Sequence, residues 1–275
     1  MSKSPMASEK ALIKSRAQKY LSKRNYKKAL GEFQRITKLD PMDLRSRLRV
    51  GDLLQKLGRG GEAVAQYKQL TRHYAEEGFL IQAISSNQII LRIDPSQEGI
   101  DKELADLYAP TGVSSQIPAK GQRVEKKLPE IPLFSELNRD ELHEVVSRLT
   151  AKRVARGSFL CKEGDPGDSI YIISSGKVGV LKYSKKKQGD ILLATLNEGY
   201  FFGEISLIFN RPRMASVRTT KTTELLELEK ADFDHAVGAY PSIKGTLEAF
   251  SRKRLEVTSH IISSSWTKKA TATMV

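Results

Sequence analysis

The chain has 275 residues, and its 46 Lys and Arg against 32 Asp and Glu give a formal net charge of +14. This length is enough for two domains of ordinary size, and an apolar fraction of 39% excludes a wholly disordered chain. A single cysteine, Cys161, excludes an intrachain disulfide. Because the sequence has no signal-peptide pattern and no apolar run long enough to span a membrane, we expect a cytoplasmic protein without a transmembrane segment.

Much of the positive charge lies near the N-terminus, where residues 1–50 hold fourteen Lys and Arg against four Asp and Glu. Such a block is typical of solvated helix faces in a basic protein. Such a block could also bind an acidic protein, nucleic acid or an anionic membrane, although solvated helix faces are the favoured interpretation. The sequence leaves these alternatives open.

Residues 10–108 are predicted to form a stack of repeated helices after a flexible start over 1–9. A shift of 34 residues superposes four pairs of residues: Ala17 with Gly51, Tyr20 with Leu54, Ala29 with Ala63, and Phe33 with Tyr67. A period of this length is typical of helix-turn-helix repeats, in which small residues let paired helices approach and large ones fill the gaps. The region resembles the tetratricopeptide repeat family, although it has no Trp and Ala75 stands where a Pro is expected. This resemblance implies a groove that binds a partner protein.

Residues 109–128 lose this periodicity and are rich in Pro, Gly, Ser and Lys, which predicts a linker. The next segment, FSELNRDELHEVVSRL from Phe134, has the pattern of an amphipathic helix with Ser135 as its N-cap. Short runs rich in β-branched and apolar residues follow: SFLCKEG, SIYIISSG, KVGVLKYS, DILLATLNEG and ASVRTTKTTELLELEK. Their even spacing and glycine punctuation are typical of a small β-barrel.

Helical patterns return at 231–236 and at 242–262, before a short basic tail. The predicted fold is therefore multidomain α + β. It consists of an N-terminal helical solenoid, a jelly-roll-like β-roll flanked by helices over 129–262, and a flexible tail over 263–275.

One segment of the predicted roll, FGEISLIFNRPRMASV at 202–217, sets charged residues among apolar ones. Gly203 and the apolar stretch from Glu204 predict a single helical turn, ended by Pro212, whose free backbone N–H groups attract an anion. Arg213 can form two parallel hydrogen bonds with a phosphate, whereas the Glu204 carboxylate suits a sugar hydroxyl. An anion and a sugar in an apolar pocket fit a nucleoside monophosphate. Alternatively, the two side chains pair with each other in a purely structural barrel.

Two motifs resemble the cyclic nucleotide-binding domain of the catabolite activator protein and of the regulatory subunits of cAMP-dependent protein kinase. They are EGDPGDSIYIISSGKVGV at 163–180 and the 202–217 segment, which is similar to the family's phosphate-binding cassette. The resemblance implies that Arg213 pairs with the cyclic phosphate and that Glu204 accepts a hydrogen bond from the ribose 2′-hydroxyl. Backbone amides near four residues would complete the phosphate cradle: Gly203, Ile205, Ala215 and Ser216.

The choice of base depends on Met214 in this resemblance. Members of the family that select cGMP often carry a threonine at this position, and its hydroxyl contacts the guanine. Met214 has no hydroxyl, although Ser216 keeps the one commonly found two residues further on. The sequence therefore favours cAMP over cGMP.

Other chemistry finds little support in the sequence. The four histidines lack metal-ligand spacing, and no catalytic serine, paired catalytic carboxylates or kinase motif occurs, so we expect no metal, no cofactor and no enzymatic activity. Too few residues follow the last predicted helix for a helix-turn-helix module, so sequence-specific DNA binding is not expected.

These features predict a regulatory adaptor in signal transduction, which senses a cyclic nucleotide in the roll and holds a partner protein at the helical repeats. The C-terminal helix would either cap the base or pair with a second copy in a homodimer. Two alternatives remain. One is a scaffold whose barrel binds no ligand, and the other is a protein that binds nucleic acid or a membrane through its basic N-terminal helices.

Overall fold

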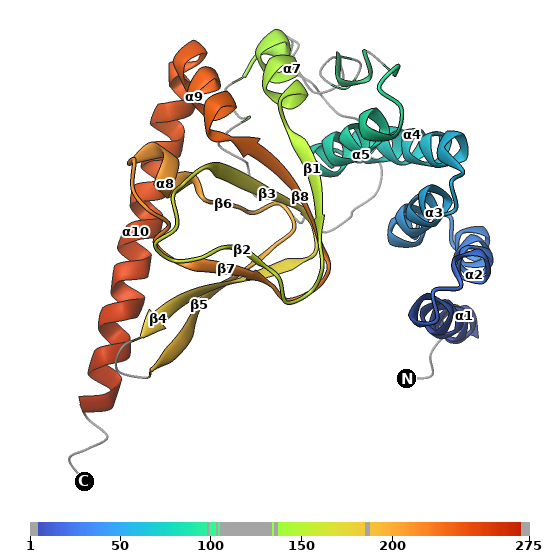
Figure 1. The fold of residues 1–275 in the computed structure, drawn as a ribbon, viewed down its shortest axis with the longest axis horizontal. Coiled ribbons are helices and arrows are strands. Elements are labelled where there is room, and N and C mark those ends of the chain that lie inside the picture. The colour runs from blue at the N-terminus through green and yellow to red at the C-terminus, as the bar shows by residue number, and fades with distance from the viewer. Residues whose placement is uncertain are drawn as a thin grey trace. The chain divides into compact units, whose positions relative to one another are not determined.

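The computed structural model describes residues 5–97, 99–102, 104, 134, 137–184 and 188–270. The chain divides into two compact units, Met1–Asp101 and Lys102–Val275 (Figure 1). The predicted linker at 109–128 lies outside the described residues. Among the helices that the structure describes, none combines the length and the apolar character needed to cross a membrane.

The first unit is helical, as predicted. Its helices are α1 (Pro5–Ser22), α2 (Tyr26–Leu39), α3 (Leu44–Lys56), α4 (Gly60–Glu76) and α5 (Leu80–Ile93). Each helix packs against the next one in the chain. Side chains of Asn25 and Asp43 cap α2 and α3 by accepting hydrogen bonds from the backbone amides of Lys28 and Ser46. The first helix begins at Pro5, inside the stretch predicted to precede the helices.

Small residues bring neighbouring helices of this unit close together. Ala17, Ala29 and Ala63, which the 34-residue shift singled out, are completely buried. At Gly51 the approach is closest, because an added Cβ atom would lie 2.8 Å from Cζ of Tyr67. The buried Tyr67 ring fills the space above the glycine, and its hydroxyl donates to Asp52 at 2.9 Å.

The second unit is a roll of two four-stranded antiparallel sheets. One sheet has the order β1-β8-β3-β6, with β1 at Thr150–Val154, β8 at Thr223–Glu229, β3 at Ser169–Ser175 and β6 at Phe201–Phe202. The other has the order β2-β7-β4-β5, with β2 at Phe159–Cys161, β7 at Ser216–Thr219, β4 at Lys177–Ser184 and β5 at Gly189–Asn197. Strands β1 and β6 were not predicted, because β1 (TAKRV) is mostly polar and β6 has two residues.

The core of the roll lies between the two sheets. It includes Tyr171 and Phe202, whose rings stack with centroids 5.1 Å apart, together with Val178, Val217 and Leu225. Strands β3 and β8 are buried along nearly their whole length, so both of their faces are covered. This explains why β3 (SIYIISS) contains a continuous apolar run, Ile170–Ile173, rather than an alternating one.

Four helices of the described chain flank the roll: α7 (Arg139–Ser147), α8 (Glu204–Ile208), α9 (Lys230–Ala239) and α10 (Pro241–Ala270). Ser135, which was predicted as the N-cap, lies outside the described residues. The helix begins at Arg139, where Asn138 and Glu141 form a capping box that satisfies free amide groups at both positions. The predicted helical turn after Gly203 is confirmed as α8, but it ends at Ile208, before Pro212. Helix α10 continues to Ala270, into the stretch predicted as a flexible tail.

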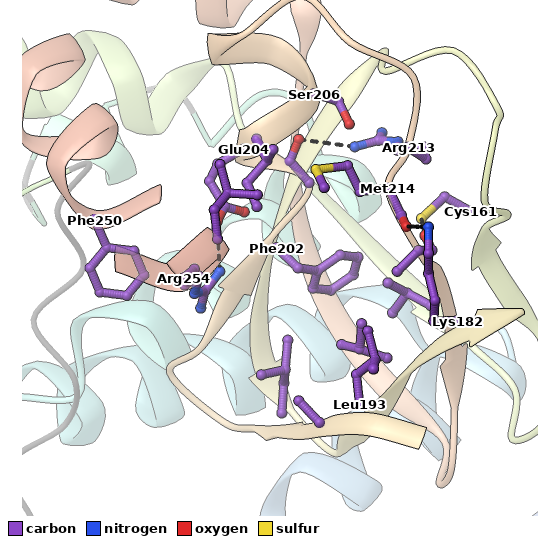
Figure 2. A pocket seen from close by; sticks show the side chains of 18 of the residues that line it. Cys161, Lys182, Leu193, Phe202, Glu204, Ser206, Arg213, Met214, Phe250 and Arg254 are labelled. Atoms are coloured by element: carbon purple, nitrogen blue, oxygen red, sulfur yellow. Dashed lines mark hydrogen bonds and ion pairs between the residues drawn. The ribbon is translucent and has the colours of Figure 1, made fainter. Parts of the chain in front are cut away.

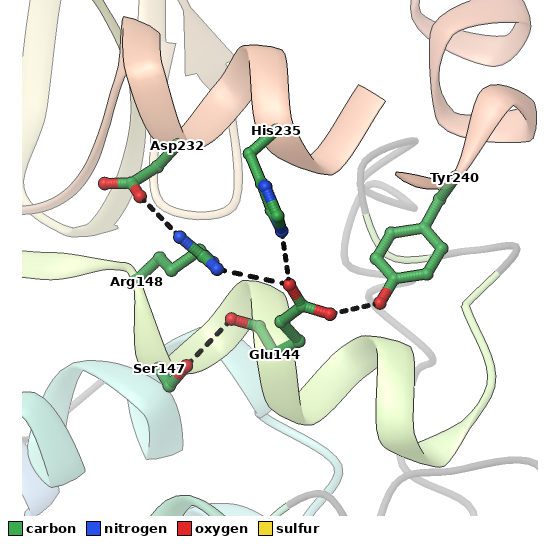
Figure 3. Close-up of polar contacts among 6 residues, drawn as sticks. All are labelled: Glu144, Ser147, Arg148, Asp232, His235 and Tyr240. Carbon is green, nitrogen blue, oxygen red and sulfur yellow. Dashed lines mark hydrogen bonds and ion pairs between the residues drawn. The ribbon is translucent and has the colours of Figure 1, made fainter. Parts of the chain in front are cut away.

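A polar junction ties α7 to the start of α10 (Figure 3). The Glu144 carboxylate accepts hydrogen bonds from Nε2 of His235 at 2.6 Å, from Arg148 at 3.2 Å and from the hydroxyl of Tyr240. Arg148 also pairs with Asp232 of α9 at 2.9 Å. The hydrogen bonds from Tyr240 and His235 lower the pKa of Glu144 to about 2, and the one to Glu144 raises the pKa of Tyr240 to about 12.

We predict that Gly51→Val destabilises the protein by about 1–3 kcal/mol, because the new side chain overlaps the Tyr67 ring in a packed interface. The matched control is Gly31→Ala in α2, where an added Cβ atom meets open space. This control should stabilise the protein by roughly 0.5–1 kcal/mol, because alanine loses less backbone entropy than glycine in a helix. Urea denaturation followed by circular dichroism measures both. A Gly51→Val protein as stable as the wild type would contradict the packing.

We predict that the Glu144 junction makes the free energy of unfolding depend on pH in the acidic range. A carboxylate whose folded pKa is lowered contributes stability above its usual pKa, and this contribution is lost as the pH falls through the folded value. The wild type should therefore lose more stability than Glu144→Gln between pH 4.5 and about 2. Urea titrations over this range measure the difference, with Glu76→Gln in α4 as the control. Identical pH profiles for wild type and Glu144→Gln would show that the junction does not form in solution.

Candidate functional site

A cavity of about 520 Å³ opens between β4, β5, α8 and α10 (Figure 2). Its walls are mostly apolar and include Val180, Leu193, Leu196, Phe202 and Phe250. Leu193 is an extra residue in β5, where the pairing with β4 shifts register between Val180 and Leu181. The bulge places Leu193 and its neighbour Ala194 together in the cavity wall. The β5 wall of the cavity is thus apolar, whereas charged side chains lie near α8 and on β4.

Arg213 is a deeply buried cation at this cavity. Its residue is 3% exposed, and its guanidinium donates to the carbonyl of Gly203 at 3.1 Å and to Oδ1 of Asp168 at 2.9 Å. The guanidinium also lies over the ring of Tyr171, 5.8 Å from its centroid. Within the described part of the chain these contacts use two of its N–H groups and leave others for an anion in the cavity.

The loop of the first motif holds the backbone of Arg213. Its amide donates to the carbonyl of Asp165 at 2.8 Å, and its carbonyl accepts from the amide of Gly164 at 2.8 Å. With Asp168 on the side chain, the 163–168 loop therefore fixes the arginine from three directions. The EGDPGD sequence, chosen for its resemblance alone, has a direct structural role beside the cassette.

Gly203 allows the chain to turn tightly beneath the guanidinium. Its φ angle is +94°, in the left-handed region that side chains disfavour. An added Cβ atom would also lie 2.6 Å from Nη1 of Arg213 and 2.7 Å from the carbonyl oxygen of Ser169. Only glycine satisfies both conditions, so Gly203 is needed for the geometry of the arginine.

Glu204 is buried at 1% exposure and does not pair with Arg213. Its Oε1 accepts a hydrogen bond at 2.8 Å from Nη1 of Arg254, which lies in α10. The same guanidinium donates to the carbonyl of Phe201 and lies 4.7 Å from the ring centroids of both Phe201 and Phe250. Helix α10 therefore contacts the carboxylate at the cavity through a charged and aromatic cluster.

Lys182 of β4 lies at the other side of the cavity. Its Nζ donates to Oε1 of Glu163 at 2.6 Å and to the carbonyl of Met214 at 2.8 Å. Burial by itself raises the pKa of the Glu163 carboxyl, but hydrogen bonds from Lys182 and the Tyr183 amide outweigh it and lower this pKa. Lys182 thus joins the strand wall to the residue that follows Arg213.

Six of the seven residues predicted at the site line the cavity: Gly203, Glu204, Ile205, Arg213, Met214 and Ala215. Ser216 lies in β7, where its hydroxyl accepts a hydrogen bond from the Glu163 amide at 2.9 Å. The alternative of a Glu204–Arg213 ion pair is wrong, because the two side chains have separate partners. Sequence reasoning missed Asp168, Lys182 and Arg254. Asp168 lies within a quoted motif, but Arg254 is one of many cations in a basic helix, and nothing in the sequence distinguishes it.

The arrangement provides a cation for an anionic group, a buried carboxylate for a hydroxyl, and an apolar space for a flat ring. Cys161 lies in the same wall, and burial raises the pKa of its thiol. Among the described residues no group of His, Cys, Asp and Glu side chains has the arrangement of a metal site.

The family model described as "Cyclic nucleotide-binding domain" matches residues 151–240. A cyclic nucleotide-gated potassium channel of Mesorhizobium japonicum is 35% identical over 126 residues, which are 46% of this chain and 32% of the channel. A cAMP-dependent protein kinase regulatory subunit of Blastocladiella emersonii is 29% identical over 155 residues, 53% of this chain and 38% of that protein. The chain thus spans about a third of the length of these relatives.

Among solved structures, the catabolite activator protein of Thermus thermophilus aligns with a TM-score of 0.44 and 29% identity, over 48% of this chain and 62% of that one. The family match begins in β1 and ends at Tyr240, so it contains both sheets of the roll and the residues that hold Arg213. Residues 151–240 are therefore a cyclic nucleotide-binding domain, which follows the helical region α1–α5 in the chain.

Proposed function

We propose that the cavity binds a 3′,5′-cyclic mononucleotide and that the protein is a non-enzymatic adaptor which responds to this ligand. The observation that carries the proposal is the buried Arg213 guanidinium, which faces the cavity in a domain of this family. A cyclic phosphate carries one negative charge, which one guanidinium can match with parallel hydrogen bonds. Glu204 accepts a hydrogen bond from the ribose 2′-hydroxyl, and the apolar wall of β4 and β5 packs against the base.

Two further points support a cyclic nucleotide. The relatives at 35% and 29% identity are by name a cyclic nucleotide-gated channel and a regulatory subunit of a cAMP-dependent kinase. The cation and the carboxylate that the ligand requires, Arg213 and Glu204, are both present. Each forms an ion pair with a different residue, so they do not neutralise one another. Met214, which offers no hydroxyl to a guanine, favours cAMP over cGMP at that position.

The signal passes to α10 through Arg254 in this proposal. In the structure, Arg254 donates to Glu204. A ribose hydroxyl donating to the same carboxylate changes the strength and position of that contact, so the ligand has different affinities for different placements of α10. Such a difference in affinity is the condition under which a ligand can shift a conformational equilibrium.

The adaptor role assigns partner binding to the helices of the first unit, as tetratricopeptide-like repeats. Helices α2 and α4 begin at Tyr26 and Gly60, which lie 34 residues apart, and this spacing supports the repeat. We place the protein in the cytoplasm, and we place a second copy, where one binds, along α10. The alternative is a scaffold whose roll binds no ligand, and the next experiment distinguishes the two.

We predict that Arg213→Ala lowers the affinity for cAMP and cGMP about ten- to a hundredfold, because a hydrogen bond to a charged group contributes roughly 1.5–3 kcal/mol. Isothermal titration calorimetry on the full chain measures the affinities. The matched control is Arg218→Ala in β7, which removes an arginine that contacts Gly157 and is not among the cavity residues. The control should bind as the wild type does.

The same titrations decide between the sensor and the scaffold. A wild type that gives neither heat nor a thermal shift with either nucleotide at millimolar concentration overturns the proposed function and leaves the scaffold. Equal losses of affinity in the Arg213 and Arg218 variants would place the ligand elsewhere.

We predict that nucleotide changes the backbone hydrogen exchange of α10 around Leu247 and Arg254 in the wild type. Arg254→Gln removes the charged contact with Glu204, so the change should become smaller while the nucleotide still binds through Arg213. Hydrogen-exchange mass spectrometry with and without saturating nucleotide measures it. The control is Arg252→Gln, two residues earlier on the same helix. The guanidinium of Arg252 lies over the ring of Phe209. An exchange response in Arg254→Gln as large as that of the wild type would contradict transmission through this arginine.

A further inference from the structure

One cation at the cavity, Lys182, has no role in the proposed binding of phosphate by Arg213 and ribose by Glu204. Lys182 lies on β4 two residues after Val180, and both side chains line the cavity. Successive side chains of a strand alternate between its faces, so Val180 and Lys182 share the face that the base would contact. The register shift between Val180 and Leu181 does not disturb this, because the extra residue, Leu193, belongs to β5.

The position of Lys182 is fixed by its partners. Its ammonium group binds Glu163 at 2.6 Å and the Met214 carbonyl at 2.8 Å. An ammonium group has three N–H donors, and the two acceptors found among the described residues leave one available. Because Lys182 lines the cavity, a ligand there can reach this donor. Figure 2 shows Lys182 beside Met214 and Cys161, on the side of the cavity away from Glu204 and Arg254. With phosphate at Arg213 and ribose at Glu204, this is the region left for the base.

A donor at this place distinguishes purines by their hydrogen-bonding edges. Guanine presents two acceptors, O6 and N7, whereas adenine presents N7 beside an amino group that is itself a donor. The one remaining N–H of Lys182 therefore meets an acceptor at either position on guanine, whereas on adenine it meets an acceptor at N7 and a competing donor at the amino group.

We propose that Lys182 is a specificity-determining residue of the cavity, which favours cyclic nucleotides with a 6-oxopurine base, as in cGMP, over those with adenine. The inference rests on the proposed function. This expected preference for cGMP is opposite to the preference for cAMP inferred from Met214. The earlier inference rests only on the absence of a hydroxyl group at position 214.

The test uses the full chain and three ligands: cAMP, cGMP and the inosine analogue cIMP, which has the 6-oxo group but no 2-amino group. We expect Lys182→Met to weaken cGMP and cIMP by about tenfold or more, the range for loss of a good contact to a base edge, and cAMP by less than about threefold. Lys182→Arg keeps donors at this edge and should preserve the preference. The control Lys177→Met removes a lysine of the same strand that is not a cavity residue, and it should change none of the three affinities.

The outcomes separate the possible failures. An equal loss for all three ligands in Lys182→Met means that Lys182 only supports the wall through Glu163 and Met214, and this overturns the inference. Unchanged affinities overturn it as well. A wild type that binds none of the ligands overturns the proposed function, and the inference with it. Thermal unfolding of each variant confirms that its fold is intact, and the Lys182→Arg titration decides the question if Lys182→Met does not fold.

Discussion

The second unit is organised around one buried positive charge, that of Arg213. A guanidinium loses hydration when it is buried, and this cost must be offset by hydrogen bonds and opposite charge. The carbonyl of Gly203 and the carboxylate of Asp168 supply part of this, but the side chain of Asp168 is 77% exposed and its charge is screened by water. Among the described residues these are the two acceptors of the guanidinium, so its buried charge is only partly compensated by the protein.

The surrounding chain follows from this requirement. The 163–168 loop binds the backbone of Arg213 on both sides, and Gly203 leaves the space that the guanidinium fills. The carbonyl of Asp168 also accepts from the amide of Lys230, where α9 begins. Helix α9 leads to Tyr240, which the Glu144 carboxylate holds at the start of α10. The cation is thus connected to α10 by a short series of hydrogen bonds, in addition to the contact between Arg254 and Glu204.

Much of this organisation could be predicted from the sequence, where local rules decide it. The glycine-separated strands, the helical turn after Gly203 and the small residues between the N-terminal helices all follow from backbone geometry and packing. The partners of the charged residues could not be predicted. Glu204 and Arg213 are nine residues apart, yet each pairs with a residue about fifty positions away in the chain. Such pairings depend on how the sheets and α10 come together, which no local pattern encodes.

The single cysteine has a practical consequence. Cys161 lies in the wall of the cavity, close enough to the cassette for its Sγ to contact the carbonyl of Ala215 at 3.9 Å. Because the chain has no other thiol, an alkylating reagent modifies it at one known place. Burial raises the pKa of the thiol, which slows its reaction with such a reagent. The protein therefore has a single native position for a chemical label, and this position lies in the wall of the cavity.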